Sequence, residues 1–533
     1  MTQTLYYNGK IFTSNDDQLY ADALIEEDEK IKWIGSEKDL TVKPERQVDL
    51  HEKRVLPGLI DSHMHPMFLA EAIQSVLCLP PLVYSIEDMK YKLAERVESS
   101  ELGEWVEAWG YDESKLKERR IPTKADLDEV SRDVPIVATR TCTHILSVNS
   151  KALELAGITR HTEDPEGGLI ERDENGDPTG VLRETARDLI LNVKPQPTLE
   201  DKVEQLLGLN DYLLSRGLLN VTDLYANIKP DDYELYQVAV ERGFTPRVGL
   251  YYRFDQMKEN DKFEISDEFL DRSKQVHVGG VKIMADGSIS GQTAWVYEHY
   301  LGTEGECGLS TVSSSMIKKA ARTARQNQIQ LVVHAMGDRA TDAVLDAVDE
   351  ESNWLDEGPS IRLEHVTFPS TRVLERSRKW SIGFVPQTIF LFAEIESYLN
   401  NVGRSRTERS YPIKTFLDQN ILTALSSDAP ATTWADPANP FIGIQSAVRR
   451  IAYNGEAYGS AEEIDVETAI KLYTREAQKV TRIPDIGQLK EGYEADFIVL
   501  DQDILNIDQD QIGETKVEQA FKKGELVYQK GGL

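Results

Sequence analysis

Residues 55–66 read VLPGLIDSHMHP, and this stretch decides how the chain is expected to fold. It opens as an apolar run, breaks at a Pro-Gly pair, and ends in His63 and His65. Side chains at i and i+2 of a strand share a face, so the two imidazoles would lie side by side at the end of a buried strand. Such a pair can bind one divalent metal ion, although a two-residue motif also arises by chance in an ordinary loop.

Apolar runs of strand length recur along the chain. They lie at 55–62, 218–224, 246–252, 278–284, 329–335, 361–367, 381–386 and 422–427. Helical spacing of apolar residues separates most of them, as in 314–327 and 338–351. Eight strand–helix repeats predict an α/β fold, a closed (β/α)8 TIM-like barrel. An open doubly wound sheet is the alternative, but no GxGxxG motif follows an early strand.

Two further regions surround the predicted barrel. Residues 67–205 interrupt the repeat after the first strand, and we expect them to be a large insertion over the mouth of the barrel. Both ends of the chain are rich in β-forming runs, and chain termini often lie close together. We therefore predict one β-sandwich domain from 1–56 and 478–533, rather than two independent hairpins. The barrel domain would span 57–477.

Composition limits the partners that the protein can have. The chain has 60 basic and 91 acidic residues, a net charge of −31, which would repel nucleic acid and anionic membranes. Its three cysteines form no metal-binding or disulfide pattern, which fits a reducing cytoplasm. We find no signal peptide and no membrane-spanning run. We expect a cytoplasmic protein with a small-molecule substrate, no nucleic-acid or membrane partner, and a homodimer as the candidate assembly.

Scarce histidines gather at the predicted strand ends. Of nine in the chain, four lie there: His63, His65, His334 and His365. Asp428 follows the last predicted strand. Because barrel enzymes build their sites at the C-terminal ends of the strands, we expect these side chains to converge. Together they could bind one metal ion or two.

Lys282 lies within an apolar strand, GGVKIM, where a charge is disfavoured. It could sit at an edge with its ammonium reaching water, or pair with an acid. A buried parallel strand favours a third possibility, in which CO₂ adds to the neutral amine and the resulting carbamate bridges two cations. Asp286 shares the strand parity of Lys282 and would face the site, unless it begins the turn at Gly287.

These motifs together resemble the amidohydrolase superfamily. The matching segments are PGLIDSHMHP, GGVKIMADGS, VVHAMGDRA, RLEHV, SSDAP and the closing GQLKEGYEADFIVLD. The inserted THILSVNSKALELAGITRHTEDPEGGLIERDENGDPTGVLRE is similar to the amidohydrolase 3 branch, which includes N-substituted formamide deformylase. The resemblance covers essentially the whole chain.

The resemblance implies a role for each matched residue. His63 and His65 would hold one metal ion, and the second histidine pair another. Lys282, carbamylated, would bridge the two ions, and Asp428 would ligate the first ion and shuttle protons. Zinc is the expected metal, with one ion or two in the site.

His144, in THILSVNSKAL of the insertion, also matches a motif of that branch. It would contact the substrate or stabilise a developing oxyanion. The alternative is a helix start, capped at Asn149 or Ser150, with a solvated or core histidine beside it.

The predicted activity is hydrolysis of a non-peptide C–N bond, in an amide or an N-substituted formamide, by metal-activated hydroxide with Asp428 as the proton shuttle. A deaminase of a cyclic amidine is an alternative, but such deaminases tend to lack the bridging carbamate that Lys282 would supply. A non-catalytic ligand-binding barrel is another, since fold alone does not establish catalysis. A binder, however, has no need of a complete set of ligands.

Overall fold

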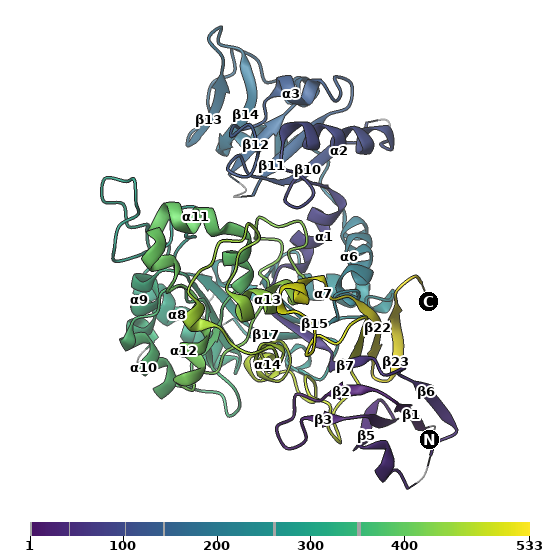
Figure 1. Cartoon of the computed structure of the whole chain (residues 1–533). Coiled ribbons are helices and arrows are strands. Elements are labelled where there is room, and N and C mark those ends of the chain that lie inside the picture. The colour runs from purple at the N-terminus through teal and green to yellow at the C-terminus, as the bar shows by residue number, and fades with distance from the viewer. Residues whose placement is uncertain are drawn as a thin grey trace. The chain divides into compact units, whose positions relative to one another are not determined.

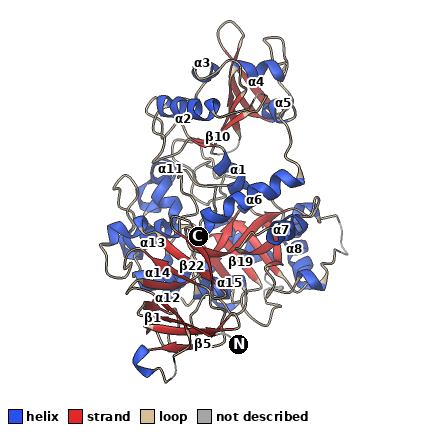
Figure 2. Cartoon of the chain, turned by 90° about the vertical axis from the view of Figure 1, so that its right-hand side faces the viewer, coloured by secondary structure: helices blue, strands red, loops and turns tan. Residues whose placement is uncertain are grey.

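The computed structural model of the chain describes residues 3–41, 43–101, 103–141, 144–259, 263–348 and 353–532. These residues form two compact units, and each is described by itself. The first unit comprises Met1–Pro66, Leu206–Ala429 and Ala438–Leu533, and the second comprises Met67–Gln205 and Pro430–Pro437. Figure 1 follows the chain through both units, and Figure 2 distinguishes their helices from their strands.

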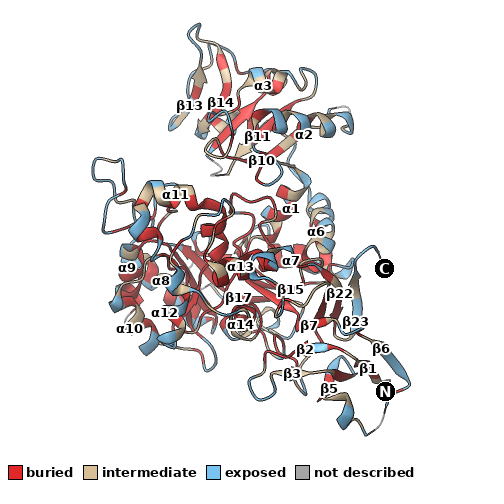
Figure 3. Ribbon diagram, in the orientation of Figure 1, coloured by how far each residue is buried: buried red, intermediate tan, exposed pale blue. Residues whose placement is uncertain are grey.

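The first unit contains a sheet of seven parallel strands, in the order β20-β19-β18-β17-β16-β15-β8. Its strands are β8 (Leu59–Met64), β15 (Leu218–Ala226), β16 (Arg247–Arg253), β17 (Val276–Met284), β18 (Gln330–Ala335), β19 (Ile361–His365) and β20 (Gly383–Val385). Nearly every residue in them is buried, as Figure 3 shows, because helices cover the outer face and side chains fill the interior. The predicted TIM-like barrel is confirmed.

The eighth predicted strand, 422–427, forms only in part. Its first half exchanges two backbone hydrogen bonds with Phe384 of β20. Beyond it, the amide of Asp428 donates to the carbonyl of His63 at 2.7 Å. Between these points, the amide of Leu425 donates a hydrogen bond to the carbonyl of Leu472 instead, at 3.1 Å. The segment therefore connects the two edge strands of the barrel without pairing regularly along its length.

Helices alternate with the barrel strands. They are α7 (Asp232–Glu241), α8 (Ser314–Gln326), α9 (Asp338–Val348), α10 (Thr371–Lys379), α11 (Thr388–Thr407), α12 (Ile413–Asp418), α13 (Pro440–Arg449), α14 (Val466–Leu472) and α15 (Arg475–Thr481). Helix α8 begins where the Ser313 hydroxyl accepts a hydrogen bond from the amide of Met316 at 3.2 Å, and it buries a face that contains Ile317 and Ala321. The helices predicted at 314–327 and 338–351 are confirmed, except that 349–351 lie outside the described residues. Within the described ranges, every helix falls short of the length or apolar character that crossing a lipid bilayer requires.

Both ends of the chain build two sheets beside the barrel in the same unit. One sheet has the order β5-β4-β1-β6 and the other β23-β22-β21-β7-β2-β3. Their strands are β1 (Gln3–Tyr7), β2 (Lys10–Phe12), β3 (Tyr20–Ala21), β4 (Ala23–Glu27), β5 (Lys30–Gly35), β6 (Arg46–Asp49), β7 (Arg54–Pro57), β21 (Phe497–Leu500), β22 (Val517–Lys522) and β23 (Glu525–Gln529). Because β7 pairs with β21, both termini share one sheet. Tyr6 of the first sheet packs against Phe497 and Phe521 of the second, and the three ring centroids are 4.6–5.3 Å apart. Both termini thus contribute to these sheets, and the bounds 1–56 and 478–533 of a sandwich domain stay a prediction.

The chain passes from the sandwich to the barrel at Gly58. Its amide donates to the carbonyl of Asp496, and the next amide, that of Leu59, donates to Gly217 in front of β15, both at 2.9 Å. A Cβ at Gly58 would lie 2.5 Å from Cδ1 of Leu219. A side chain at position 58 would displace Leu219 of β15, so glycine suits the close approach of the two segments.

The second unit contains a mixed sheet, in the order β13-β14-β12-β11-β10-β9. Its strands are β9 (Val76–Leu77), β10 (Val106–Tyr111), β11 (Ile136–Arg140), β12 (Ile145–Val148), β13 (Gly168–Arg172) and β14 (Pro178–Glu184). Helices α2 (Ile86–Glu98), α3 (Lys124–Asp128), α4 (Ser150–Leu155) and α5 (Asp188–Leu191) accompany the sheet, while α1 (Pro66–Gln74) and α6 (Leu199–Leu214) lie where the chain enters and leaves this unit. Leu93 of α2 packs with Val106 and Ile136 in its core.

Candidate metal centre

The ends of four barrel strands bring most of the predicted ligands together. His63 lies in β8 with His65 directly after it, Lys282 lies in β17, and His334 and His365 belong to β18 and β19. All of them belong to the first unit, as does Asp428, which follows the partly formed eighth strand. The ring centroids of His63 and His365 are 5.2 Å apart, and those of His334 and His365 are 4.3 Å apart. The C-terminal mouth of the barrel therefore gathers the four histidines that the sequence singles out.

Asp428 joins the first histidine pair. Its Oδ1 lies 3.1 Å from Nε2 of His63 and 3.0 Å from Nε2 of His65. Burial alone would raise the pKa of Asp428, but the two imidazoles hold it well below its usual value. The carboxylate is therefore ionised at neutral pH and faces the nitrogen atoms that would bind a metal ion.

His63, His365 and Asp428 form a compact set of ligand atoms. One nitrogen or oxygen from each lies within 4.8 Å of the others, and all three residues are buried. Burial lowers the pKa of His334 to about 4 and that of His365 well below its usual value. Both imidazoles are neutral at pH 7, which is the form that coordinates a metal ion.

Two members of this set hold an unusual backbone conformation. His365 has φ of 73° and Asp428 has φ of 56°, both in the left-handed region that disfavours residues other than glycine. Such strain costs about 1–3 kcal/mol per residue and persists where the surrounding structure enforces it. Its occurrence at two converging side chains is typical of a functional site.

Lys282 is buried beside these ligands. Its side chain has no hydrogen-bond partner among the described residues. Burial lowers the pKa of Lys282 to about 8, although Glu364 and Asp428 act in the opposite direction. A part of the amine is therefore uncharged near neutral pH, as addition of CO₂ requires. Carbamylation remains a prediction.

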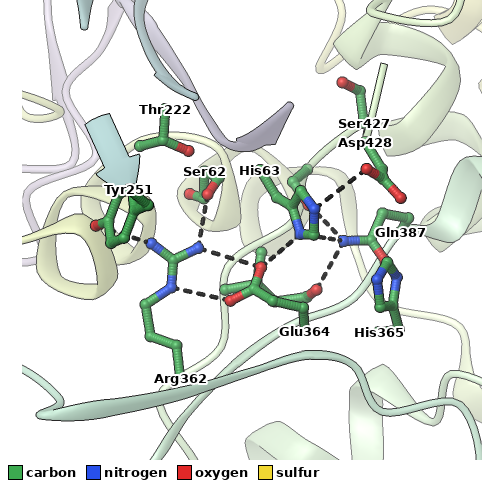
Figure 4. A network of polar contacts seen from close by, with 12 residues as sticks. Ser62, His63, Thr222, Tyr251, Arg362, Glu364, His365, Gln387, Ser427 and Asp428 are labelled. Carbon is green, nitrogen blue, oxygen red and sulfur yellow. Dashed lines mark hydrogen bonds and ion pairs between the residues drawn. The ribbon is translucent and has the colours of Figure 1, made fainter. Parts of the chain in front are cut away.

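Arg362 and Glu364 support His63 from behind, and the sequence analysis missed both. Figure 4 shows the network: Oε2 of Glu364 accepts a hydrogen bond from Nδ1 of His63 at 2.6 Å, and Arg362 donates to both carboxylate oxygens at 3.1 and 3.2 Å. The Arg362 guanidinium also donates to the carbonyl of Ser62 at 2.6 Å and to the hydroxyl of Tyr251 at 3.1 Å. With its Nδ1 proton engaged, His63 presents Nε2 to the site. The available signal was the alternation of charged residues in IRLEH, an otherwise apolar strand.

Gln387 orients His365 as Glu364 orients His63, and no pattern in the sequence predicted this contact. Its Oε1 lies 2.6 Å from Nδ1 of His365, and its Nε2 donates to the carbonyl of Val385 and to the hydroxyl of Ser426. Since the amide nitrogen is committed to two acceptors, the amide oxygen must accept from Nδ1. Nε2 of His365 is then the unprotonated atom, and within the described residues it has no hydrogen-bond partner.

Asp286 lies beyond the end of β17, so strand parity does not fix its direction. Its carboxylate accepts hydrogen bonds from the backbone amides of Met336, Gly337 and Trp295 at 2.8–2.9 Å. The same carboxylate lies 3.5 Å from Nε2 of His334, so Asp286 also reaches the candidate site. Its substrate contact stays a prediction.

His144 belongs to the second unit, where it is exposed and its Nδ1 lies 2.8 Å from Oε2 of Glu184. Nearby, the side chain of Asn149 caps α4 by accepting a hydrogen bond from the amide of Ala152 at 3.0 Å. The predicted helix cap is confirmed. The contact of His144 with a substrate stays a prediction.

Comparison with known proteins identifies the family of this chain. The sequence profile of the Amidohydrolase family matches residues 46–528. YtcJ of Bacillus subtilis is 31% identical over 99% of this chain and 100% of its own, and N-substituted formamide deformylase of Arthrobacter pascens is 28% identical over 100% and 99%. The crystal structure of an uncharacterised metal-dependent hydrolase from Pyrococcus furiosus superimposes with a TM-score of 0.73, at 25% identity, over 95% of this chain and 100% of that one. The chain therefore belongs to the amidohydrolase family.

Proposed function

We propose that the protein is a metal-dependent hydrolase that cleaves a non-peptide C–N bond in an amide or an N-substituted formamide. The convergence of His63, His365 and Asp428, with ligand atoms within 4.8 Å of one another, carries this proposal. The relative from Arthrobacter pascens is an N-substituted formamide deformylase that aligns over nearly its whole length, which supports the substrate class.

The donor set fits a divalent metal ion. His365 Nε2 and Lys282 Nζ are buried polar atoms without hydrogen-bond partners among the described residues, and such atoms point to a missing ligand. Imidazole and carboxylate donors suit zinc. His63, His65 and Asp428 would hold one ion, and His334 and His365 would hold another. Lys282, as a carbamate, would lie between them.

Each residue has a distinct task in the proposed reaction. A bound divalent ion supplies Lewis acidity, which lowers the pKa of water toward neutrality. Asp428, ionised at neutral pH, accepts a proton from the attacking water at its carboxylate and returns it to the leaving nitrogen. Glu364 keeps the Nδ1 proton of His63 in place while this occurs. The buried setting of these groups excludes bulk water and strengthens their electrostatic effects.

A reconstitution assay tests the proposal. The protein is stripped with a chelator, reloaded with zinc or manganese, and assayed on amides, N-substituted formamides and lactams. Activity is expected only in the reloaded protein, and Asp428→Asn should lower kcat by about 10²–10⁴-fold. The matched control is Asp418→Asn, whose side chain is 61% exposed, and it should keep full activity.

Three outcomes would contradict the proposal. Full turnover by the metal-free protein would exclude a metal-dependent reaction. Release of ammonia from a cyclic amidine, without cleavage of amides, would favour a deaminase. Tight binding of one of these compounds without any turnover would favour a ligand-binding barrel.

A further inference from the structure

A cavity of about 350 Å³ lies between the ends of β15, β16 and β17 and the start of α8, within the first unit. Tyr225, Met284 and Met316 form its apolar wall. Lys282 also lines the cavity and is 3% exposed, whereas Lys258 at another part of the lining is exposed. The cavity therefore extends from the candidate metal centre to the protein surface.

Tyr225 connects the cavity to the metal centre. Its ring packs edge-on against His65, with centroids 6.0 Å apart and planes at 88°. The guanidinium of Arg253 covers the Tyr225 ring at 4.3 Å from its centroid. Asp255 holds that guanidinium through two hydrogen bonds of 3.1 and 2.8 Å. A substrate with its scissile bond beside His65 would extend past Tyr225 into the cavity.

The outer part of the cavity is positively charged, in contrast to the chain as a whole. Arg253 and Lys258 contribute two cations against the single carboxylate of Asp255, whereas the chain has a net charge of −31. The N-terminal turn of α8 also borders the cavity through Ser313 and Met316, and it contains no acidic residue. Helix N-termini favour negative charge, so these features act in the same direction.

We propose that this cavity binds the substituent on the substrate nitrogen, and that this substituent is a short apolar chain that ends in a carboxylate. The inference rests on the proposed function and specifies its substrate. The methionines and Tyr225 contact the apolar chain, and Lys258 and Arg253 bind the carboxylate. The volume of about 350 Å³ lies within the range of small-molecule pockets and accommodates such a chain.

Three formamides with six-carbon substituents on nitrogen test the inference with the metal-loaded protein. N-formyl-6-aminohexanoate ends in a carboxylate, N-hexylformamide in a methyl group, and N-(6-aminohexyl)formamide in an ammonium. The carboxylate substrate should have a kcat/KM about tenfold above that of the methyl substrate, because a hydrogen bond to a charged group is worth this factor or more. The ammonium substrate should be the poorest of the three.

Lys258→Gln should lower kcat/KM for N-formyl-6-aminohexanoate about tenfold, with a much smaller change for N-hexylformamide. Arg253→Gln should act in the same direction. Lys318→Gln is the matched control, since Lys318 is exposed on α8 and does not line the cavity. An unchanged preference in Lys258→Gln and Arg253→Gln, or no preference in the wild-type protein, would overturn the inference.

A binding measurement separates this inference from the proposed reaction. Calorimetry with hexanoate and hexan-1-ol should show tighter binding of hexanoate, weakened about tenfold in Lys258→Gln. If this holds but no formamide is hydrolysed, the carboxylate site stands and the proposed function is wrong. If formamides are hydrolysed without regard to the carboxylate, the function stands and the site is wrong. Hexanoate binding that chelation abolishes and Lys258→Gln leaves unchanged would assign the carboxylate to the metal centre and overturn the inference.

Discussion

Replacing Arg362 with methionine would test how the barrel holds His63 in place. Arg362 is fully buried, and its guanidinium donates to Glu364, to the carbonyl of Ser62 and to the hydroxyl of Tyr251. Methionine fills much of the same space but provides no donor. The substitution therefore leaves the buried carboxylate of Glu364 with its hydrogen bond from His63 but without the arginine that pairs with it directly.

The distances give the size of the effect. At 3.1 Å and an effective dielectric constant of about 20, one Arg–Glu charge pair is worth about 5 kcal/mol. Removing one partner of a buried ion pair destabilises proteins by about 3–5 kcal/mol, because an uncompensated charge stays behind. We therefore expect Arg362→Met to lower the free energy of unfolding by about 3–5 kcal/mol. Burial alone would raise the pKa of Glu364, and Arg362 and His63 now hold it below its usual value, so this pKa should rise in the variant.

The assay is urea unfolding of the metal-free protein, arranged as a double-mutant cycle with Arg362→Met and Glu364→Gln. Contacting charges should be coupled, so that the double variant loses at least about 2 kcal/mol less than the sum of the single variants. Arg322→Met, at an exposed position of α8, is the control and should change stability by less than about 0.5 kcal/mol. Single effects that add within about 0.5 kcal/mol would refute the proposed coupling.

Two further predictions concern buried groups. Desolvation lowers the pKa of the buried His277 imidazole to about 3. Below the ordinary pKa of histidine, the unfolded chain therefore binds a proton that the folded protein does not. The free energy of unfolding then decreases as the pH is lowered. Between pH 7 and pH 5, protonation of this single group in the unfolded chain should lower the free energy of unfolding by about 2 kcal/mol. The loss should disappear in His277→Gln and persist in His161→Gln, a control at an exposed histidine. Equal losses in the wild type and both variants would contradict the assignment. Glu364→Gln should weaken zinc binding by about 10–100-fold in a competition titration with a chromogenic chelator, because His63 loses its carboxylate partner; an unchanged affinity would show that Glu364 does not tune the ligand.

The barrel could be predicted from the sequence because its strands are buried on both faces. A run such as VGGVKIM is buried along nearly all of its length, so it stands out as an apolar segment between helical patterns, with Lys282 as its one charged residue. The eighth strand is less regular because the amide of Leu425 bonds outside the barrel, to Leu472. No local pattern of residues reveals which distant carbonyl will compete for an amide.

The candidate site was predictable where a residue type was scarce or out of place. Histidines at strand ends and Lys282 in an apolar strand could be identified as site candidates because such residues are unusual at those positions. Arg362 and Glu364 gave the same signal in IRLEH, and the argument used for Lys282 would have found them. Gln387 gave none, because an uncharged amide after a strand is common, and its importance comes from a contact with His365 that only the fold creates. The insertion was recognised as an interruption of the repeat, but the order of its six strands depends on pairings that are distant in the sequence.

The central claim is that His63, His365 and Asp428 share a metal centre, and metal analysis tests it most directly. Wild-type protein equilibrated with zinc and freed of unbound ions should contain one or two zinc ions per chain by mass spectrometry. The double variant His63→Ala/His365→Ala should contain none above the buffer blank, while His299→Ala, at an exposed histidine, should match the wild type. Equal zinc content in the double variant and the wild type would contradict the account.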